Sequence, residues 1–432
     1  MKQRTLQLLI LAALSSTGAM AQINCISGPA SHKLVCEFPY AAGLLTNETA
    51  LGGSAGIATA NKAAGQVATA FNSAIATQVS QLPLASASAG TIVVYKNGVP
   101  ETFNNLGPIL TDRAQTIGKH RLFIGFTASQ FVFTNIDGIS LSKLPFSFVS
   151  TAYVPGTNTV STNTYTSEET DLSFKLDQFT GVATYGVTNR FDMSVIVPVE
   201  YVSMGATTYN STSYILSPNG SLIFGPYTNP QSHTPGTASG IGDITFNGKG
   251  ELWRGERATV SAGMYVRTPT GDDQNYLGSG AWGFSPYLVY GFLWKVAPHA
   301  KIGYEWNTST ELNNPSGKPG GNLALPGGLN YDVGADWAML RHVTVAGDLL
   351  GNQYINSPRY VTSSVPLPDN PSTASLATIT PETLTYSINN LSVGLKWNPY
   401  ADLVLSGNVL IQLNNNGLRS RPTPLIGISY KF

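Results

Sequence analysis

The residues best able to do chemistry in this sequence are five histidines, His32, His120, His233, His299 and His342. A lipid hydrolase needs a serine beside a histidine that a carboxylate orients. We predict that His233, His299 and His342 lie in a loop or in turns, and no serine and carboxylate can be placed beside His120. We therefore expect the chain not to be an enzyme and assign no catalytic residue. A hydrolase built on His120 is the least favoured alternative.

Thiols and carboxylates give no metal site. Cys25 and Cys36 are the two cysteines, and in an oxidising compartment such a close pair is predicted to form a disulfide. There is no CxxC pattern of the kind that holds zinc. Asp272 and Asp273 are a weak calcium signal, and a solvated turn explains them better. We predict no metal and no cofactor.

The first residues resemble an export signal. Lys2 and Arg4 precede a short apolar run at 6–14, and the small residues around Ala21 form a cleavage site. The run is too short to cross a bilayer as a helix. We expect residues 1–21 to be a cleaved signal peptide; an uncleaved anchor is the alternative.

The composition is unlike that of a soluble domain. Charged residues make up 11% of the 432 residues, against roughly 25% in ordinary soluble domains. Removing Lys2 and Arg4 from the 24 basic residues leaves 22 against 24 acidic ones. This balance gives no reason to expect a nucleic-acid partner.

From position 119 onward, runs of about ten residues alternate apolar side chains with polar or small ones. The clearest run places six apolar side chains on one face: Phe191, Met193, Val195, Val197, Val199 and Tyr201. This length and period are typical of transmembrane β-strands, whereas strands of soluble proteins average about five to six residues.

Short and long connections alternate between these runs. Very short turns are predicted at 186–190, 254–256, 295–298, 339–341 and 398–400, and longer loops at 134–169, 205–240, 269–281, 308–327, 357–384 and 414–420. In outer-membrane barrels the short turns face the periplasm and the long loops face outward. We predict an all-β fold, a transmembrane antiparallel β-barrel over 119–432. Its strands lie near 119–133, 170–186, 189–204, 241–254, 256–268, 282–294, 298–307, 328–338, 341–355, 385–397, 400–413 and 421–432. The expected number is twelve, or fourteen if 140–167 forms a further wall hairpin.

The alternation also predicts which charges face the lumen, because a charge on the lipid face costs about 2–4 kcal/mol near the midplane. The lumen-facing candidates are Asp192, Glu200, Asp243, Lys249, Glu251, Arg257, Arg267, Glu305, Asp332 and Asp336. Lys301, Asp348, Lys396 and Asp402 share this face. We expect these charges to pair across neighbouring strands, with Lys249 and Glu251 against Arg257 and Arg267. Both signs are present, so no anion-selective ladder is expected.

Aromatic residues mark the two ends of the barrel. The six tryptophans, Trp253, Trp282, Trp294, Trp306, Trp337 and Trp397, fall near predicted strand ends, as in the aromatic belts at a lipid–water interface. The chain also ends on an alternating strand in which Ile428, Tyr430 and Phe432 share the lipid-facing side. This ending is similar to the signal that the outer-membrane assembly machinery reads, and we predict that role for these three residues.

The segment 22–118 precedes the barrel and differs from it. Residues 61–82 are Ala-rich, with apolar side chains at helical spacing until Pro83: Val67, Phe71, Ile75, Val79 and Leu82. We predict one amphipathic helix that either plugs the lumen or lies in the periplasm as a stabilising cap.

Two stretches, GIGDITFNGKGELW (240–253) and YVRTPTGDDQNYLGSGAWGFSPYLVYGF (265–292), resemble the signature of the putative meta-pathway phenol-degradation family of bacterial outer-membrane proteins. The resemblance implies a channel similar in concept to the long-chain fatty acid transporters. It would admit small hydrophobic or aromatic solutes across the outer membrane of a Gram-negative bacterium. A structural or surface-binding barrel that acts through its long loops is the alternative from the residues themselves. The expected partners are outer-membrane lipid, the assembly machinery and the solute.

Overall fold

The computed structural model describes residues 33–37, 70–80, 82, 92–96, 99–103, 106–154, 157, 159–229, 231–314, 320–367, 375–400 and 402–432. The predicted signal peptide, Cys25 and Val67 lie outside these residues, as do 61–69 of the predicted helix. Cys36 lies in a short 3-10 helix, η2 (Leu34–Cys36), and is disulfide-bonded. Within the described residues, no helix is long and apolar enough to cross a membrane.

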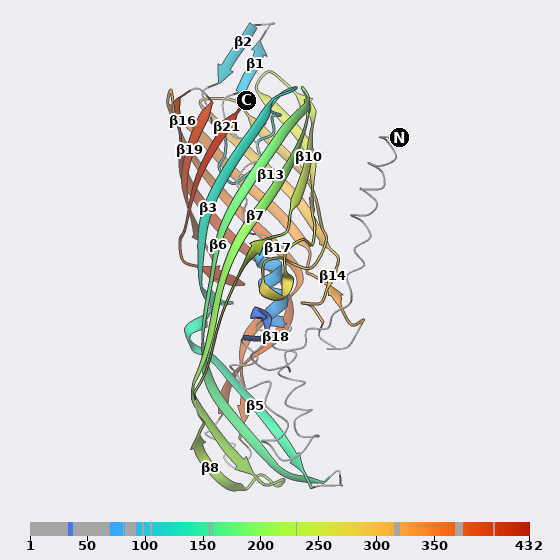
Figure 1. The fold of residues 1–432 in the computed structure, drawn as a ribbon, viewed down its shortest axis with the longest axis vertical. Coiled ribbons are helices and arrows are strands. Elements are labelled where there is room, and N and C mark those ends of the chain that lie inside the picture. The colour runs from blue at the N-terminus through green and yellow to red at the C-terminus, as the bar shows by residue number, and fades with distance from the viewer. Residues whose placement is uncertain are drawn as a thin grey trace.

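A closed antiparallel β-barrel of twelve strands dominates the fold (Figure 1), which confirms the predicted class and strand number. The wall strands are β3 (Leu122–Ile136), β6 (Val160–Thr188), β7 (Phe191–Leu216), β10 (Thr245–Arg254), β11 (Ala258–Arg267), β12 (Gly283–Phe292), β13 (Val296–Asn307), β16 (Gly328–Leu340), β17 (Val343–Pro366), β18 (Ser375–Tyr400), β19 (Leu403–Gln412) and β21 (Thr423–Lys431). The last strand pairs with the first, Leu425 opposite Ser129 through Lys431 opposite Phe123, and this pairing closes the barrel.

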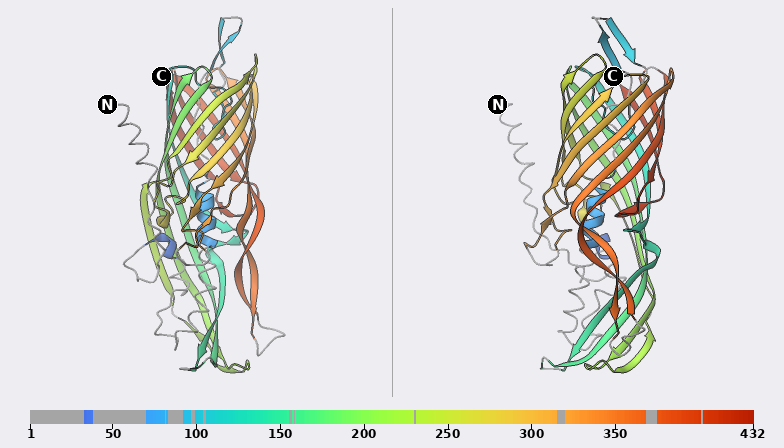
Figure 2. Two further views of the ribbon diagram at one scale, coloured as in Figure 1. Left: turned by 90° about the vertical axis from the view of Figure 1, so that its right-hand side faces the viewer. Right: turned by 180° about the vertical axis from the view of Figure 1, so that it is seen from behind.

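Four strands continue far beyond the wall, where loops were expected. β6, β7, β17 and β18 have 29, 26, 24 and 26 residues, so the loop predictions for much of 134–169, 205–240 and 357–384 were wrong. These segments are rich in Thr and Ser, whose side chains suit strands when a partner strand is present. Figure 2 shows the extensions at the end of the barrel opposite the short turns, which we call the loop end.

The region 140–167 does not add strands to the wall. β3 pairs with residues 174–185 of β6, and β5 (Leu144–Tyr153) pairs with residues 160–170 of the same strand. β5 therefore continues the direction of β3 past β4 (Ile139–Ser140) and η3 (Leu141–Lys143). The fourteen-strand alternative is wrong, because β5 belongs to the extension, as does β8 (Leu222–Thr228), which pairs with the outer end of β7. β9 (Ser232–Ile241) pairs with residues 199–208 of β7, next to the residues that pair with β10.

Short elements complete the structure. β1 (Ile92–Lys96) and β2 (Val99–Phe103) form a hairpin that projects beyond the short-turn end (Figure 1). η4 (Asp273–Asn275), β14 (Ser309–Thr310), β15 (Leu323–Ala324) and β20 (Leu418–Ser420) lie at the loop end.

The outer face of the barrel is apolar, as the alternation predicts. Phe126, Met193, Leu288 and Ile302 are about half exposed or more. Five of the six tryptophans are exposed as well: Trp253, Trp294, Trp306, Trp337 and Trp397. Four tryptophans lie near the short turns, and Trp282 and Trp306 lie at the loop end, so two aromatic belts are present.

Candidate functional site: the lumen and the segment inside it

The lumen contains chain from before the first wall strand. Residues 70–79 are helical and buried among the side chains of the wall at the loop end, and residues 106–118 run beside the inner wall at the short-turn end (Figure 1). We call these the inner helix and the inner strap. Gly186 allows the strap to leave the lumen, since a Cβ there would lie 1.8 Å from the carbonyl oxygen of Gly118.

Two inward lysines bind the carbonyl oxygens of the inner strap. Lys249 Nζ donates to Arg113 O at 2.6 Å and to Gln115 O at 3.1 Å. Lys396 Nζ donates to Leu106 O at 3.3 Å and also to Pro108 O. Both ammonium groups are buried and use their donors on the strap backbone, so they fix the strap rather than line an open pore.

Two inward carboxylates bind the amides of the same strap. Glu251 Oε1 accepts from Thr116 N at 2.8 Å, and Asp192 Oδ2 accepts from Ile117 N at 2.8 Å. These charge-assisted bonds are among the stronger hydrogen bonds in proteins. Lys249, Glu251 and Asp192 therefore bind the strap, which the expectation of cross-strand pairing had missed.

A buried charge cluster joins the strap to the middle of the wall. Lys301 Nζ lies 3.0 Å from Asp112 Oδ2 and 3.6 Å from Asp332 Oδ2, and the Tyr265 hydroxyl donates to Asp112 at 2.6 Å. The ammonium of Lys301 also lies 5.2 Å from the ring centres of Tyr265 and Tyr287. Asp112 and the two tyrosines were not among the predicted site residues, because nothing in their local sequence marks a contact across the lumen.

The loop-end half of the lumen is apolar. Phe71 and Ile75 of the inner helix are 1% and 0% exposed and belong to a core with Phe131, Phe174 and Met204 of the wall. Val79 is buried and Leu82 packs against the same core. The described plug candidates therefore pack against wall side chains, and their role as a plug stays a prediction.

Polar contacts fix the inner helix to the loops. The Tyr276 hydroxyl donates to Asn72 Oδ1, and Leu418 N donates to Gln78 Oε1, both at 2.5 Å. Tyr276 directly follows η4, which begins at Asp273. Burial, and then the charge of Glu311, raises the pKa of Asp273 to about 7.

Arg267 links the end of the inner helix to polar and charged residues of the wall and the loops. Its guanidinium donates to Ser80 O at 2.9 Å and to Asn307 Oδ1 at 2.6 Å, and it lies 3.2 Å from Glu305 and 3.8 Å from Asp243. Asp243 also accepts hydrogen bonds from Gly271 N and Ser279 N. The two segments 240–243 and 269–271, which belong to the stretches quoted for the family resemblance, are thus held together by this carboxylate.

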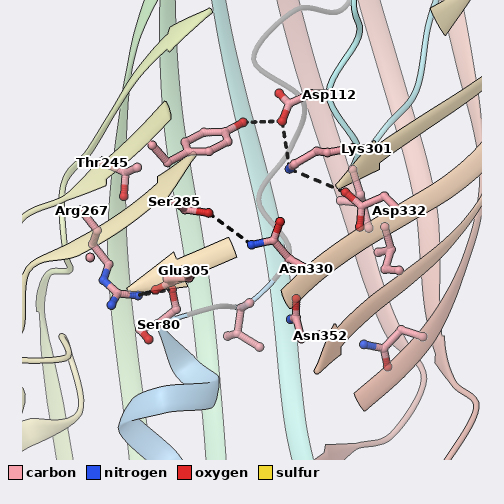
Figure 3. Close-up of a pocket in the computed structure, with 16 residues that line it drawn as sticks. Ser80, Asp112, Thr245, Arg267, Ser285, Lys301, Glu305, Asn330, Asp332 and Asn352 are labelled. Carbon is pink, nitrogen blue, oxygen red and sulfur yellow. Dashed lines mark hydrogen bonds and ion pairs between the residues drawn. The ribbon is translucent and has the colours of Figure 1, made fainter. Parts of the chain in front are cut away.

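A cavity of about 160 Å³ remains between the inner helix and the inner strap. Figure 3 shows Asp112, Lys301 and Asp332 at one end of it and Arg267, Glu305 and Ser80 at the other. Asn330 and Asn352 lie on facing positions of β16 and β17, and Leu82, Leu110 and Leu350 add apolar surface to the lining. The cavity is therefore lined by lumen charges, amides and a small apolar surface.

Most of the predicted lumen-facing residues are inside the barrel. Glu200 is buried and accepts from Gln178, and Asp336 lies 3.5 Å from His299. His299 itself was wrongly assigned to a turn: it is buried on β13, with Asp348 2.8 Å away on its other side. The strand begins at Val296 rather than at 298, so His299 lies within it and not in the preceding turn.

Arg257 is the exception. It is exposed at the turn before β11, where its guanidinium stacks on the ring of Trp294 at 3.8 Å. The predicted cluster of Lys249 and Glu251 with Arg257 and Arg267 is wrong, because Arg267 pairs with Thr245 at the opposite end of β10. An arginine next to a turn can reach an aromatic ring outside the barrel, and the alternation of the strand no longer governs it.

No group of three or more potential metal ligands is found within the described part of the chain. Ile428, Tyr430 and Phe432 all face outward, with exposed fractions of 47%, 37% and 66%. The structure agrees with their predicted orientation, and their role in assembly stays a prediction.

Comparison with known proteins gives one family. Residues 150–340 match the family described as "Putative MetA-pathway of phenol degradation", and a search of curated proteins finds no match. The chain is similar to an outer membrane channel from Pseudomonas putida F1, with 14% identity, 74% of this chain and 98% of that chain covered and a TM-score of 0.42. It is also similar to a FadL homologue of Pseudomonas aeruginosa, with 10% identity, coverage of 72% and 89% and a TM-score of 0.29.

A third similar structure is the toluene transporter of Ralstonia pickettii, with 8% identity, 73% of this chain and 90% of that chain covered and a TM-score of 0.31. At such TM-scores these likenesses carry no argument about this chain. The match over 150–340 confirms the family resemblance seen in the sequence.

Proposed function

We propose that the protein is an outer-membrane channel for passive uptake of small solutes, and that the inner strap closes its lumen at rest. The short turns would face the periplasm and the extensions would face outward. The observation that carries this proposal is the use of inward charges. Lys249, Lys396, Glu251 and Asp192 bind backbone groups of residues 106–117.

This arrangement suits a gate better than a permanent filling. Polar contacts to a single strand of backbone can be exchanged for water one after another, whereas an apolar core of packed rings cannot. Two strap residues, Ile109 and Leu110, belong to the large apolar core, against six residues of the inner helix. Polar contacts therefore have the larger share in holding the strap, and apolar burial has the larger share in holding the inner helix. The strap is therefore the part of the lumen segment that would move first.

A reversible cross-link tests the gate. A Cβ at Gly291 would lie 3.1 Å from Ala114 Cβ, close to the Cβ spacing of about 3.5–4.5 Å in disulfides. The variant A114C/G291C in liposomes should admit small aromatic or hydrophobic solutes when reduced and exclude them when oxidised. The single variants A114C and G291C, and the unmodified protein with and without reductant, are the controls.

Two results would count against the proposal. Equal solute entry in the oxidised and reduced double variant would show that the strap does not move during transport. If the unmodified protein admitted no solute at all, the channel function itself would be rejected.

Surface binding is a second candidate, and the loop-end extension favours it. The β17–β18 hairpin contacts β5, where Ser147 Oγ donates to Ala377 O and Ser147 N donates to Thr378 Oγ1. Such an ordered surface could bind another molecule. Deleting residues 356–384 should then abolish binding to cells or surfaces while solute entry into liposomes is unchanged; loss of solute entry alone would favour the channel.

A further inference from the structure

The cavity between the inner helix and the inner strap has the size of a single ring. Its volume is about 160 Å³, and an engineered cavity of roughly 150 Å³ in another protein holds benzene. The leucines Leu82, Leu110 and Leu350 offer apolar contact over part of the lining. The other lining residues are mainly polar or charged. A pure hydrocarbon would displace water from these groups and would form no hydrogen bond with them in return.

The donors of the two cations in the lining are already in use. Lys301 is paired with Asp112 and Asp332. Arg267 is engaged by Glu305, Asn307 and the carbonyl of Ser80. A carboxylate ligand would therefore have to break an existing ion pair to find a donor.

Acceptors and negative charge are in excess. Three carboxylates, Asp112, Glu305 and Asp332, line the cavity with only two cations, Arg267 and Lys301. On Asn330, the amide nitrogen donates to Ser285 Oγ at 3.2 Å, while Oδ1 has no hydrogen-bond partner among the described residues. The lining thus favours a ligand that gives hydrogen bonds and carries no negative charge.

We propose that this cavity is a binding site for uncharged, single-ring solutes that bear hydroxyl groups, and that it discriminates against both hydrocarbons and carboxylates of the same size. The ring packs against the leucines, and the hydroxyl groups donate to the carboxylate and amide oxygens of β13, β16 and β17. This inference rests on the proposed channel function, because the site would bind the solute during its passage through the lumen. Its test does not depend on transport.

The test is a set of binding titrations on the full-length protein in detergent, followed by calorimetry. The probes are catechol, toluene and benzoate, which share ring size and differ in hydroxyl groups and charge. Catechol should bind saturably, at least about tenfold more tightly than either of the others. Tighter or equal binding of toluene or benzoate, or no saturable binding of catechol, would overturn the proposal.

A charge variant sharpens the test. D332N removes one negative charge from the lining, and Lys301 keeps Asp112 as a partner. Benzoate binding should then improve by roughly tenfold, while D171N, a change at an exposed position on β6, should alter nothing. If D332N leaves the ratio of catechol to benzoate affinity unchanged in a correctly assembled barrel, the charge argument fails.

Solute entry into liposomes separates this inference from the proposed function. Catechol that binds in detergent but does not enter liposomes would leave the binding site standing and reject the channel. Catechol that enters without saturable binding would keep the channel and reject the site.

Discussion

Replacing Lys396 with methionine should increase the fraction of time that the channel is open. Lys396 is 2% exposed, and its ammonium group donates to Leu106 O and Pro108 O of the inner strap. Methionine keeps most of the apolar stem and removes both hydrogen bonds. The docked strap should therefore lose stability relative to the displaced strap, while the wall stays intact.

The size of the effect can be bounded from the contacts. Each hydrogen bond to a charged group contributes about 1.5–3 kcal/mol, so two give at most about 3–6 kcal/mol. Removing the buried ammonium recovers part of its desolvation cost. We expect a net change of about 1–3 kcal/mol, which shifts the ratio of displaced to docked strap by roughly 5- to 150-fold.

Single-channel recording in planar bilayers measures this ratio as open time, which is preferable to conductance because the substitution also changes lumen charge. Lys249→Met should act in the same direction, since Lys249 binds Arg113 O and Gln115 O. Lys295→Met, at an exposed turn, is the matched control. Unchanged open time in both lumen variants, with normally assembled barrels, would refute the view that these lysines hold the strap.

Two other predictions concern the ends of the molecule. Deleting Phe432, which is 66% exposed at the end of the last strand, should lower the yield of heat-modifiable barrel without reducing export; a normal yield would remove the assembly role. In the extension, burial raises the pKa of Glu168 to about 8 against a hydrogen bond from Ser211 that lowers it. The protonated form is thus favoured in the folded extension, whose stability should be full below pH about 4.5 and fall as pH rises through about 8, by at most about 5 kcal/mol. Protease cleavage of the extension should accelerate over that range and become pH-independent in E168Q, and a flat profile in the unmodified protein would contradict the burial argument.

The sequence by itself determined the barrel, because alternation along a strand is a local property. Successive side chains of a β-strand point to opposite faces, so the run from Phe191 to Tyr201 shows which residues face lipid without knowledge of any partner. The short turns and the even number of strands followed from the same pattern. The inward position of Asp192, Lys249 and Glu251 followed as well, since a lipid-facing charge is costly.

Only the tertiary structure decided what those inward charges bind. Lys249, Lys396 and Glu251 contact backbone carbonyls and amides of the inner strap, and a backbone group has no side-chain signature that a sequence could display. The extended strands were missed for a related reason: Thr- and Ser-rich segments pair as strands only when a partner such as β5 lies beside them. The cavity and its excess of acceptors arise where the strap, the inner helix and wall strands from β10 to β18 meet. Its chemistry therefore depends on side chains from distant parts of the sequence, such as Ser80 and Asn390, that only the tertiary structure brings to one lining.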